Sequence, residues 1–300
     1  MNARDTFLAL IVAMLWGAQV TAVKIGGSEF PPILMVAIRF AIMSIFLFPF
    51  IFRLRRHQFR SVFLIASVTG TVHFGLLYCG ISLVDASTAA IIYQLATPFT
   101  LLLAVVVLRE AINAQVISGI LLALTGVIIL FFNPAASGSV LGMALVAMAA
   151  LMFASGSVLT KYFGPLDPLA LSAWTAIVSA PELLIWSLIQ ESGQWSGMIA
   201  ASYRAWAAVL YTAVSGGLVG FGLWFWLLSR YSVQTLSPFL LLVPLFAVVV
   251  SQVMLSEGLS ARLLLGTVMT MLGVALCQLR WPLRRKQCGS LEGRTGDANN

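Results

Sequence analysis

The chain has 300 residues, of which 60% are hydrophobic and only 9% are charged, and its formal net charge is +7. Because a water-soluble domain normally carries about 25% charged residues, this composition excludes an ordinary soluble domain. So few charges are enough to mark the ends of helices whose sides face lipid, and their distribution is more informative than their sum.

Ten segments are apolar over the length of about 20 residues that a membrane-spanning helix needs. In the first half of the chain they are predicted at 6–25, 31–52, 61–82, 86–108 and 114–132. In the second half they are predicted at 139–160, 168–189, 204–229, 234–256 and 262–281. The longest break is the polar stretch 191–203, and the polar end, 282–300, is predicted to be a disordered cytoplasmic tail. The sequence therefore predicts an all-α membrane protein with ten transmembrane helices.

Lysine and arginine residues near the helix ends indicate the orientation, because cytoplasmic loops carry an excess of them. With the N-terminus in the cytoplasm, thirteen of these residues lie inside, and only Lys24, Arg204 and Arg262 lie outside. This bias predicts a multi-pass protein of the cell inner membrane with both termini in the cytoplasm.

The two halves of the chain repeat one another. At offsets of 137, 146 and 147 residues, the matched pairs include Trp16 and Phe153, Lys24 and Lys161, Gly70 and Gly216, Tyr78 and Trp224, Pro98 and Pro244, and Glu110 and Glu257. We therefore predict two five-helix repeats, at 1–133 and 139–281. Because five is an odd number, the second copy is inverted in the membrane. Inverted repeats are typical of secondary transporters, which bind substrate near the bilayer midplane.

The fifth helix of each repeat carries a further pattern. Residues 119–132 and 266–279 each follow a proline-containing helix and a Leu-x-Glu end, at 108–110 and 255–257. These segments resemble the EamA repeat of the drug/metabolite transporter superfamily, and the resemblance runs from Leu8 to Leu279. It implies ten helices around a central cavity lined mainly by helices 1, 3, 4, 6, 8 and 9. The chain looks most like bacterial members that export amino acids or other small metabolites.

Polar and aromatic side chains near the predicted midplane form the candidate substrate site. Such groups face the bundle interior, because burying them unpaired in lipid costs free energy. There they either line the cavity or bond to neighbouring helices, and the two tryptophans fit an interfacial or lipid-facing position equally well. The candidates are Trp16, Gln19, His73, Tyr78, Tyr93, Gln94 and Trp224.

Pro98 and Pro244 are predicted near the centres of helices 4 and 9. A proline inside a helix removes one hydrogen bond and frees the carbonyl four residues earlier, here at Gln94 and Leu240. Recurrence in both repeats favours a hinge over a packing kink, and a cavity water or a substrate ammonium is the expected partner of these carbonyls. Four glycines of helices 3 and 8 either permit close packing or ease bending. They are Gly70, Gly75, Gly216 and Gly220.

Two charged residues, Arg39 and Glu182, fall inside predicted spans. An ionisable residue within the membrane indicates function unless a partner satisfies it. The two lie at similar depths from the outer ends of helices 2 and 7. We expect either a structural ion pair or, for Glu182, a proton-carrying carboxyl group.

The sequence lacks the motifs of enzymes, metal sites and nucleotide sites. It has two histidines, no His-Glu-x-x-His or Cys-x-x-Cys ligand set and no phosphate-cradling Gly-x-x-x-x-Gly-Lys loop. We therefore expect no catalytic residues, no metal, no cofactor and no nucleic-acid partner. The partners expected are the lipid bilayer and a small-molecule substrate, and the oligomeric state stays open.

These features favour a secondary exporter of small organic solutes, above all amino acids, that works by alternating access. The alternative is an exporter of drugs or other metabolites from the same superfamily. A drug-cation exporter needs an accessible carboxylate, and Glu182 lies outside the helices expected to line the cavity. A nucleotide-sugar exchanger needs several cations, and Arg39 alone is too few. A channel is a further, less favoured alternative.

Overall fold

The computed structural model describes the whole chain except residues 111–112, 132–138, 232, 259 and 279–300. The predicted tail, 282–300, lies outside the described residues. In the described part, all regular structure is helical, and ten stretches are long and apolar enough to cross a membrane. The predicted all-α membrane architecture is therefore confirmed.

The first five spans consist of eleven described helical segments. Span 1 is α1 (Ala3–Gly26), and span 2 is α2 (Pro32–Leu47) followed by the 3₁₀ segment η1 (Phe48–Arg53). Span 3 consists of η2 (Arg56–Gln58), α3 (Phe59–Ala66), the π segment η3 (Ser67–Val72) and α4 (His73–Leu83). Span 4 consists of α5 (Ala86–Ile92), the 3₁₀ turn η4 (Tyr93–Leu95) and α6 (Ala96–Leu108), and span 5 is α7 (Ala114–Phe131).

The second five spans follow the same order. Spans 6 and 7 are α8 (Val140–Tyr162) and α9 (Pro168–Gln190). Span 8 consists of α11 (Tyr203–Leu210), the π segment η5 (Tyr211–Val219) and α12 (Gly220–Leu228). Span 9 is α13 (Val233–Leu240) with α14 (Leu242–Leu255), and span 10 is α15 (Ala261–Gln278).

The predicted spans differ from the observed helices mainly in two places. The third span begins at Arg56, five residues before the expected start, because the polar run that precedes its apolar part is already helical. The predicted break at 191–203 contains the short helix α10 (Gln194–Ala200). An apolar pattern of membrane length does not detect either of these polar helical turns.

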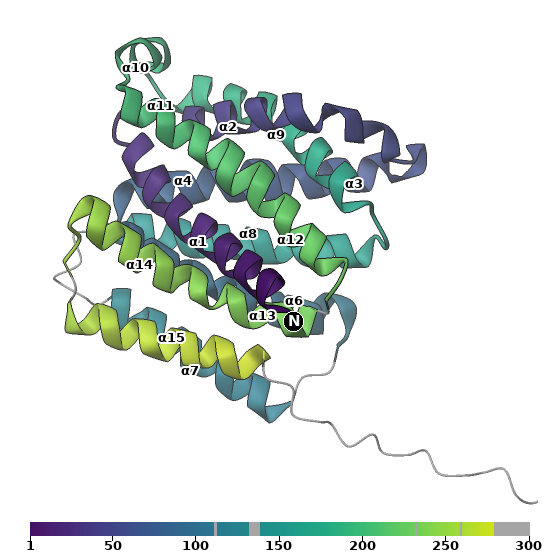
Figure 1. Cartoon of the computed structure of the whole chain (residues 1–300), viewed down its shortest axis with the longest axis vertical. Coiled ribbons are helices and arrows are strands. Elements are labelled where there is room, and N and C mark those ends of the chain that lie inside the picture. The colour runs from purple at the N-terminus through teal and green to yellow at the C-terminus, as the bar shows by residue number, and fades with distance from the viewer. Residues whose placement is uncertain (111–112, 132–138, 232, 259, 279–300) are drawn as a thin grey trace, which may run out of the picture.

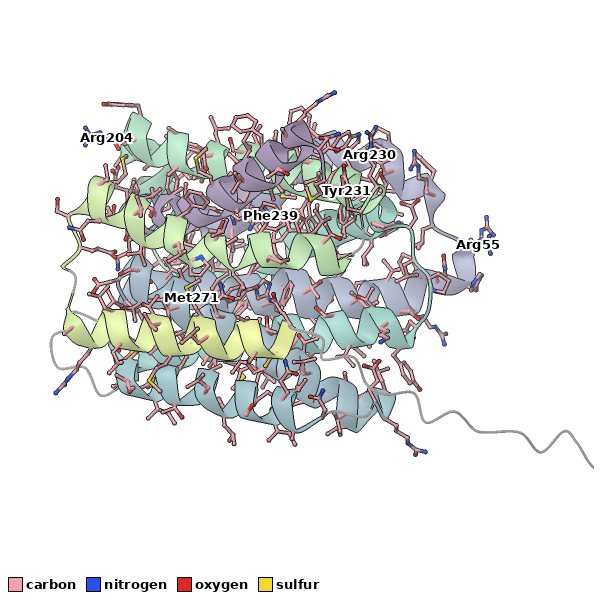
Figure 2. The ribbon with its side chains drawn as sticks, turned by 60° about the horizontal axis from the view of Figure 1, so that its bottom comes forward. Arg55, Arg204, Arg230, Tyr231, Phe239 and Met271 are labelled. Carbon is pink, nitrogen blue, oxygen red and sulfur yellow. The ribbon has the colours of Figure 1, made fainter. Side chains whose placement is uncertain are left out.

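The spans lie side by side in one bundle, with their ends gathered at two opposite faces (Figure 1). The start of α1 and the end of α15 lie at one end, which we call the N-terminal face, and α10 lies at the other, which we call the α10 face. Arg55 and Arg204 project from these two opposite ends (Figure 2). The described part of the chain therefore begins and ends on the same side.

Helix packing follows the internal repeat. Equivalent helices pair with each other at the two edges of the bundle, α2 with α9 and α7 with α15 (Figure 1). Between them, α1 packs against α14 and α8 packs against α6, and exchanging the repeats turns one of these pairs into the other. The two Leu-x-Glu ends also share an uncommon backbone state, because Arg109 and Ser256 adopt left-handed φ angles of 55° and 54°.

Glycines bring α7 and α15 into backbone contact. A methyl group added at Gly119 would lie 2.7 Å from the carbonyl oxygen of Gly273, and one at Gly126 would lie 2.8 Å from that of Gly266. In lipid no hydrophobic force drives helices together, so close van der Waals packing of small residues replaces it. The seven-residue spacing of these glycines puts them on one helix face and so fixes where the two repeats join.

Three glutamates on the α10 face cap the N-termini of helices from other parts of the chain. Glu191 accepts hydrogen bonds from the backbone amides of Ile33 (2.7 Å) and Leu34 at the start of α2. Glu257 accepts from the amides of Ala86 (2.6 Å) and Ser87 at the start of α5. A carboxylate at a helix N-terminus satisfies amides that have no partner within the helix and is favoured by the helix dipole.

The third of these caps joins the loop after α1 to α11. Glu29 accepts from the backbone amide of Ser202 (2.6 Å) and from its hydroxyl group (2.7 Å). These hydrogen bonds, the one from the backbone first, hold the pKa of the Glu29 carboxyl below its usual range. A lowered carboxyl pKa means that the cap is present at neutral pH and is lost as the pH falls through that pKa.

We predict that Gly273→Ala lowers the free energy of unfolding by about 1–3 kcal/mol, the usual cost of overpacking. Its methyl group would lie 2.6 Å from the carbonyl oxygen of Gly119 across the helix pair. Gly222→Ala is the matched control, because nothing lies within 4 Å of the added atom and alanine favours the helix. Thermal unfolding in detergent measures both, and equal melting temperatures would contradict the role of the glycine contact.

Candidate functional site

Spans 3 and 8 each contain a π segment, η3 and η5, at equivalent positions of the two repeats. Gly70 lies in η3 and its repeat partner Gly216 lies in η5. A π turn interrupts the regular i→i+4 ladder and leaves carbonyl groups available to other donors. In the middle of a membrane those donors have to come from the protein or from an internal cavity. The π segments therefore determine where polar side chains gather.

In span 3 the donor is His73, of which only 2% is exposed. Its Nδ1 lies 2.8 Å from the carbonyl oxygen of Thr69. A carbonyl only accepts, so we assign the hydrogen to Nδ1. Its Nε2 lies 2.8 Å from the hydroxyl oxygen of Tyr93. The neutral ring therefore accepts at Nε2 from the Tyr93 hydroxyl.

Aromatic rings surround this histidine. The ring centroids of Phe74, Phe153 and Tyr93 lie 4.3, 5.5 and 5.7 Å from that of His73. The sequence reasoning selected Trp16 and not Phe153, although the two are repeat partners, so the repeat itself was a signal that could have found Phe153. Tyr78, which is 1% exposed, lies near Phe74 on α4, with centroids 6.3 Å apart.

The second group of predicted residues gathers at the other π segment. Trp16 donates its indole N–H to the carbonyl oxygen of Gly216 at 3.0 Å. Its ring lies 5.2 Å from Phe221 and 5.5 Å from Trp224, and the side chain of Gln19 packs against Gly216. One carbonyl of each π segment thus receives a ring N–H donor, His73 at η3 and Trp16 at η5, and both donors belong to the first repeat. Trp16 and Trp224 lie in this cluster and are both half-buried.

The predicted site residues therefore form two clusters and not one ring of side chains. His73, Tyr78 and Tyr93 belong to the cluster at η3, and Trp16, Gln19 and Trp224 belong to the cluster at η5. Helix α1 packs against segments of both spans, α4 and η5, and so connects the clusters. Gln94 lies half-buried in η4, next to Tyr93.

Spans 4 and 9 are both interrupted just before their prolines. The α-helix of span 4 breaks at η4 (Tyr93–Leu95), and Pro98 follows in the first turn of α6. Span 9 breaks at Leu241, between α13 and α14, and Pro244 follows in the same way. A proline lacks the amide that would bond four residues back, so the interruption falls there. The carbonyl of Gln94 therefore lacks the amide four residues on, and the backbone amide of Ala96 donates to it instead.

The four predicted hinge glycines all lie at close helix contacts. A methyl group added at Gly70 or Gly75 would collide with side chains of α9, and one added at Gly216 or Gly220 would collide with side chains of α1. The contacted residues are Ser179, Trp186, Gln19 and Trp16, respectively. Close packing accounts for each of these glycines, and a hinge role stays a prediction.

Arg39 is buried, with 1% of its surface exposed, and lies against span 3. Its guanidinium carbon lies 4.3 Å from the ring centroid of Phe74 and 5.4 Å from that of Phe40. Among the described residues its one hydrogen bond runs from Nη1 to the hydroxyl of Tyr78 at 3.5 Å, and its Nε has no partner. The cation is thus held mainly by aromatic faces.

Glu182 has a different set of partners. The hydroxyl groups of Ser67 (2.9 Å) and Thr71, both in η3, donate to its two carboxylate oxygens. In the described part of the chain the ion pairs are Arg53 with Asp167 and Lys161 with Glu110. The predicted pairing of Arg39 with Glu182 is therefore wrong in this structure, because similar depth does not make two helices present their side chains to each other. The proton-carrying role of Glu182 stays a prediction.

A cavity of about 510 Å³ opens at the N-terminal face. Its lining comes from the loop between spans 2 and 3 and the loop between spans 6 and 7, and it includes Arg53, Arg55, His57 and Asp167. These residues lie at helix ends and come from neither aromatic cluster. We therefore do not assign this cavity to the predicted substrate site.

Comparisons with known proteins follow the same two-repeat pattern. The family model of the EamA-like transporter family matches the chain twice, over residues 5–132 and 140–278. A probable amino-acid metabolite efflux pump of Salmonella typhimurium is 29% identical over 298 residues, which cover 95% of this chain and 98% of that protein. Its namesake from Escherichia coli is 27% identical and covers 94% of this chain and 97% of that protein.

Two further comparisons are more distant. A probable terminal-alkyne amino-acid exporter of Streptantibioticus cattleyicolor is 28% identical over 212 residues, which cover 69% of each chain. A solved crystal structure shares the fold with a TM-score of 0.63 at 18% identity, covering 92% of this chain and 96% of that one. The fold is thus one that has been seen in a crystal.

We predict that the effects of Arg39→Met and Glu182→Met on the free energy of unfolding add to within about 0.5 kcal/mol, because the two side chains bond to different residues, Tyr78 and Phe74 for one and Ser67 and Thr71 for the other. Thr71→Val combined with Glu182→Met is the matched comparison. These two residues share a hydrogen bond, so their effects on the free energy of unfolding should not add. Equilibrium unfolding in detergent provides the cycle. A coupling energy above about 1 kcal/mol between Arg39 and Glu182 would show instead that the two residues form an ion pair.

Proposed function

Because the chain belongs to the EamA-like transporter family, we propose that it is a secondary exporter of small organic solutes, above all amino acids, working by alternating access. The observation that carries the proposal is the repetition of interrupted helices around polar aromatic clusters. Spans 3 and 8 carry the π segments, and spans 4 and 9 break before their prolines. The relatives named as amino-acid metabolite efflux pumps support the substrate class.

The chemistry of the clusters suits a zwitterion. His73 and Tyr93 form a buried, hydrogen-bonded pair, and the carbonyl of Gln94, which lacks its regular helical donor, can accept a further hydrogen bond from an ammonium group through its second lone pair. The proposal includes no catalytic and no metal role, in keeping with a family of transporters. In the described residues no three His, Cys, Asp or Glu side chains are grouped as metal ligands.

Alternating access fits the geometry of an inverted repeat. If the repeats exchange conformations, spans 4 and 9 exchange roles, and each carries a break near its proline at which to bend. Membranes tolerate such broken helices where the freed groups face protein or a water-lined path. The proposed path runs between the two aromatic clusters, along α1.

Export of drug cations is the weaker alternative. It needs an open carboxylate, and both carboxylate oxygens of Glu182 already accept from η3 hydroxyl groups. A buried guanidinium at Arg39 would also repel a cation. We place the protein in the inner membrane, with the N-terminal face in the cytoplasm, on the bias of lysine and arginine residues.

The function is tested by uptake of radiolabelled amino acids into proteoliposomes, with and without a pH gradient. We expect saturable uptake of one or more amino acids above that of protein-free vesicles. Conductance far above the turnover of a carrier would identify a channel instead. Uptake of drug cations or other metabolites in the absence of any amino-acid uptake would support the alternative substrate class.

For the orientation, we predict that Ser196→Cys on α10 reacts with a membrane-impermeant maleimide on intact cells, because the α10 face is proposed to be external. Ser229→Cys, which follows α12 at the N-terminal face, is the matched control and should react only after the cells are opened. The background lacks Cys79, Cys277 and Cys288. The opposite labelling pattern would reverse the proposed topology.

For the mechanism, we predict that Pro98→Ala and Pro244→Ala keep or raise thermal stability and lower the initial rate of uptake. Alanine restores the missing backbone hydrogen bond, and an interior proline costs a helix about 3 kcal/mol relative to alanine. The restored bond also recaptures the carbonyl of Gln94 or Leu240 and removes a bending point. Stable variants that transport at the wild-type rate would exclude the hinge, and a joint loss of stability and transport would indicate a packing role.

A further inference from the structure

Arg39 is the least satisfied charge that the structure places inside the bundle. A guanidinium has five N–H donors, all of which seek acceptors. The described structure gives Arg39 one hydrogen bond, at 3.5 Å to the Tyr78 hydroxyl, and its buried Nε has none. Contact with the faces of Phe74 and Phe40 compensates part of the charge. It does not replace the hydrogen-bond acceptors that the remaining N–H groups lack.

The unmet requirement points to an anion. An intramembrane cation normally pairs with a carboxylate or with backbone carbonyls, because desolvating it alone costs several kcal/mol. Glu182, the partner that the sequence analysis predicted, has both oxygens engaged with Ser67 and Thr71. His73 carries its Nδ1 hydrogen toward Thr69 and offers its Nε2 to Tyr93. Neither residue supplies a negative charge to Arg39.

Arg39 belongs to the η3 cluster through shared rings. Phe74, on which the guanidinium stacks, is also the ring nearest to His73, at 4.3 Å. His73 in turn bonds Tyr93, which adjoins Gln94. A solute held beside His73 would therefore find a buried cation at one end of the cluster and, near the other, the carbonyl of Gln94, whose regular helical donor is missing at Pro98.

We propose that Arg39 is the binding group for the carboxylate of the transported solute. The guanidinium presents parallel N–H donors that match the two oxygens of a carboxylate, a geometry that a lysine ammonium does not provide. This inference rests on the proposed function, and it restricts the substrates to solutes with a free carboxylate. Esters, amides and amine drugs lack the required charge and are excluded.

The test compares acids with their uncharged amides. The probes are L-leucine with L-leucinamide, L-phenylalanine with L-phenylalaninamide, L-threonine with L-threoninamide and, as the smallest pair, acetate with acetamide. Binding is followed from the ligand-dependent rise in melting temperature of the purified protein, which reports affinity without requiring transport. We expect at least one acid to bind the wild-type protein about 10- to 100-fold more tightly than its amide, the range of a charge-assisted hydrogen bond.

Arg39→Gln should reduce this acid-to-amide ratio to about 1. Arg39→Lys keeps the charge but not the two-pronged geometry, and it should give an intermediate ratio. Arg204→Gln, the same change at an exposed arginine of the α10 face, is the matched control and should leave the ratio unchanged (Figure 2). Transport by Arg39→Gln should show a raised KM for the acid.

The outcomes separate this inference from the proposed function. If the wild-type protein binds acids and amides equally, or a folded Arg39→Gln keeps the wild-type ratio, the carboxylate site is overturned even when amino acids are transported. If acetate binds through Arg39 but no amino acid is transported, the site stands and amino-acid export fails. If Arg39→Gln does not fold, the acid-to-amide ratio of the wild-type protein and of Arg39→Lys still decides the question.

Discussion

The structure depends on one constraint, which is that polar groups within a membrane have to find partners inside the protein. The breaks in spans 3, 4, 8 and 9 would each leave backbone groups unpaired in lipid. The ring N–H groups of His73 and Trp16 donate hydrogen bonds to carbonyls of the two π segments. On the α10 face, Glu29, Glu191 and Glu257 accept hydrogen bonds from the backbone amides at helix N-termini. Irregular backbone is thus present where side chains compensate it.

The same constraint is met differently by the two charged residues inside the spans, Glu182 and Arg39. Glu182 receives two hydroxyl donors from η3, which makes it a satisfied group that ties span 7 to span 3. Arg39 receives one long hydrogen bond and two ring faces, so its requirement for acceptors is left for a solute to meet. The difference between the two residues lies in their surroundings and not in their depth, and it gives the proposed binding site its polarity.

The inverted repeat places the π segment and the Leu-x-Glu end once in each half of the chain. The π segments hold Gly70 and Gly216, and the Leu-x-Glu ends hold Arg109 and Ser256 in the same left-handed state. The repeats meet at the glycine contact of α7 with α15 and at the contact of α2 with α9. The two site clusters are nevertheless unlike in chemistry, since histidine and tyrosine serve one and tryptophan the other. A symmetric frame therefore carries two unlike clusters, which suits the proposed recognition of a solute with two different ends.

The sequence by itself determined the ten spans, the order of the repeats and the breaks at Pro98 and Pro244, because apolar length and a missing amide act locally. It did not reveal α10 or the two π segments, since a membrane-length apolar pattern reads the same for α and π turns. It also misassigned the partner of Arg39. Depth follows from position along one helix, whereas partners follow from how each helix is rotated against its neighbours. Only tertiary packing sets that rotation, and it decided that Arg39 faces Phe74 and Tyr78 while Glu182 faces Ser67 and Thr71.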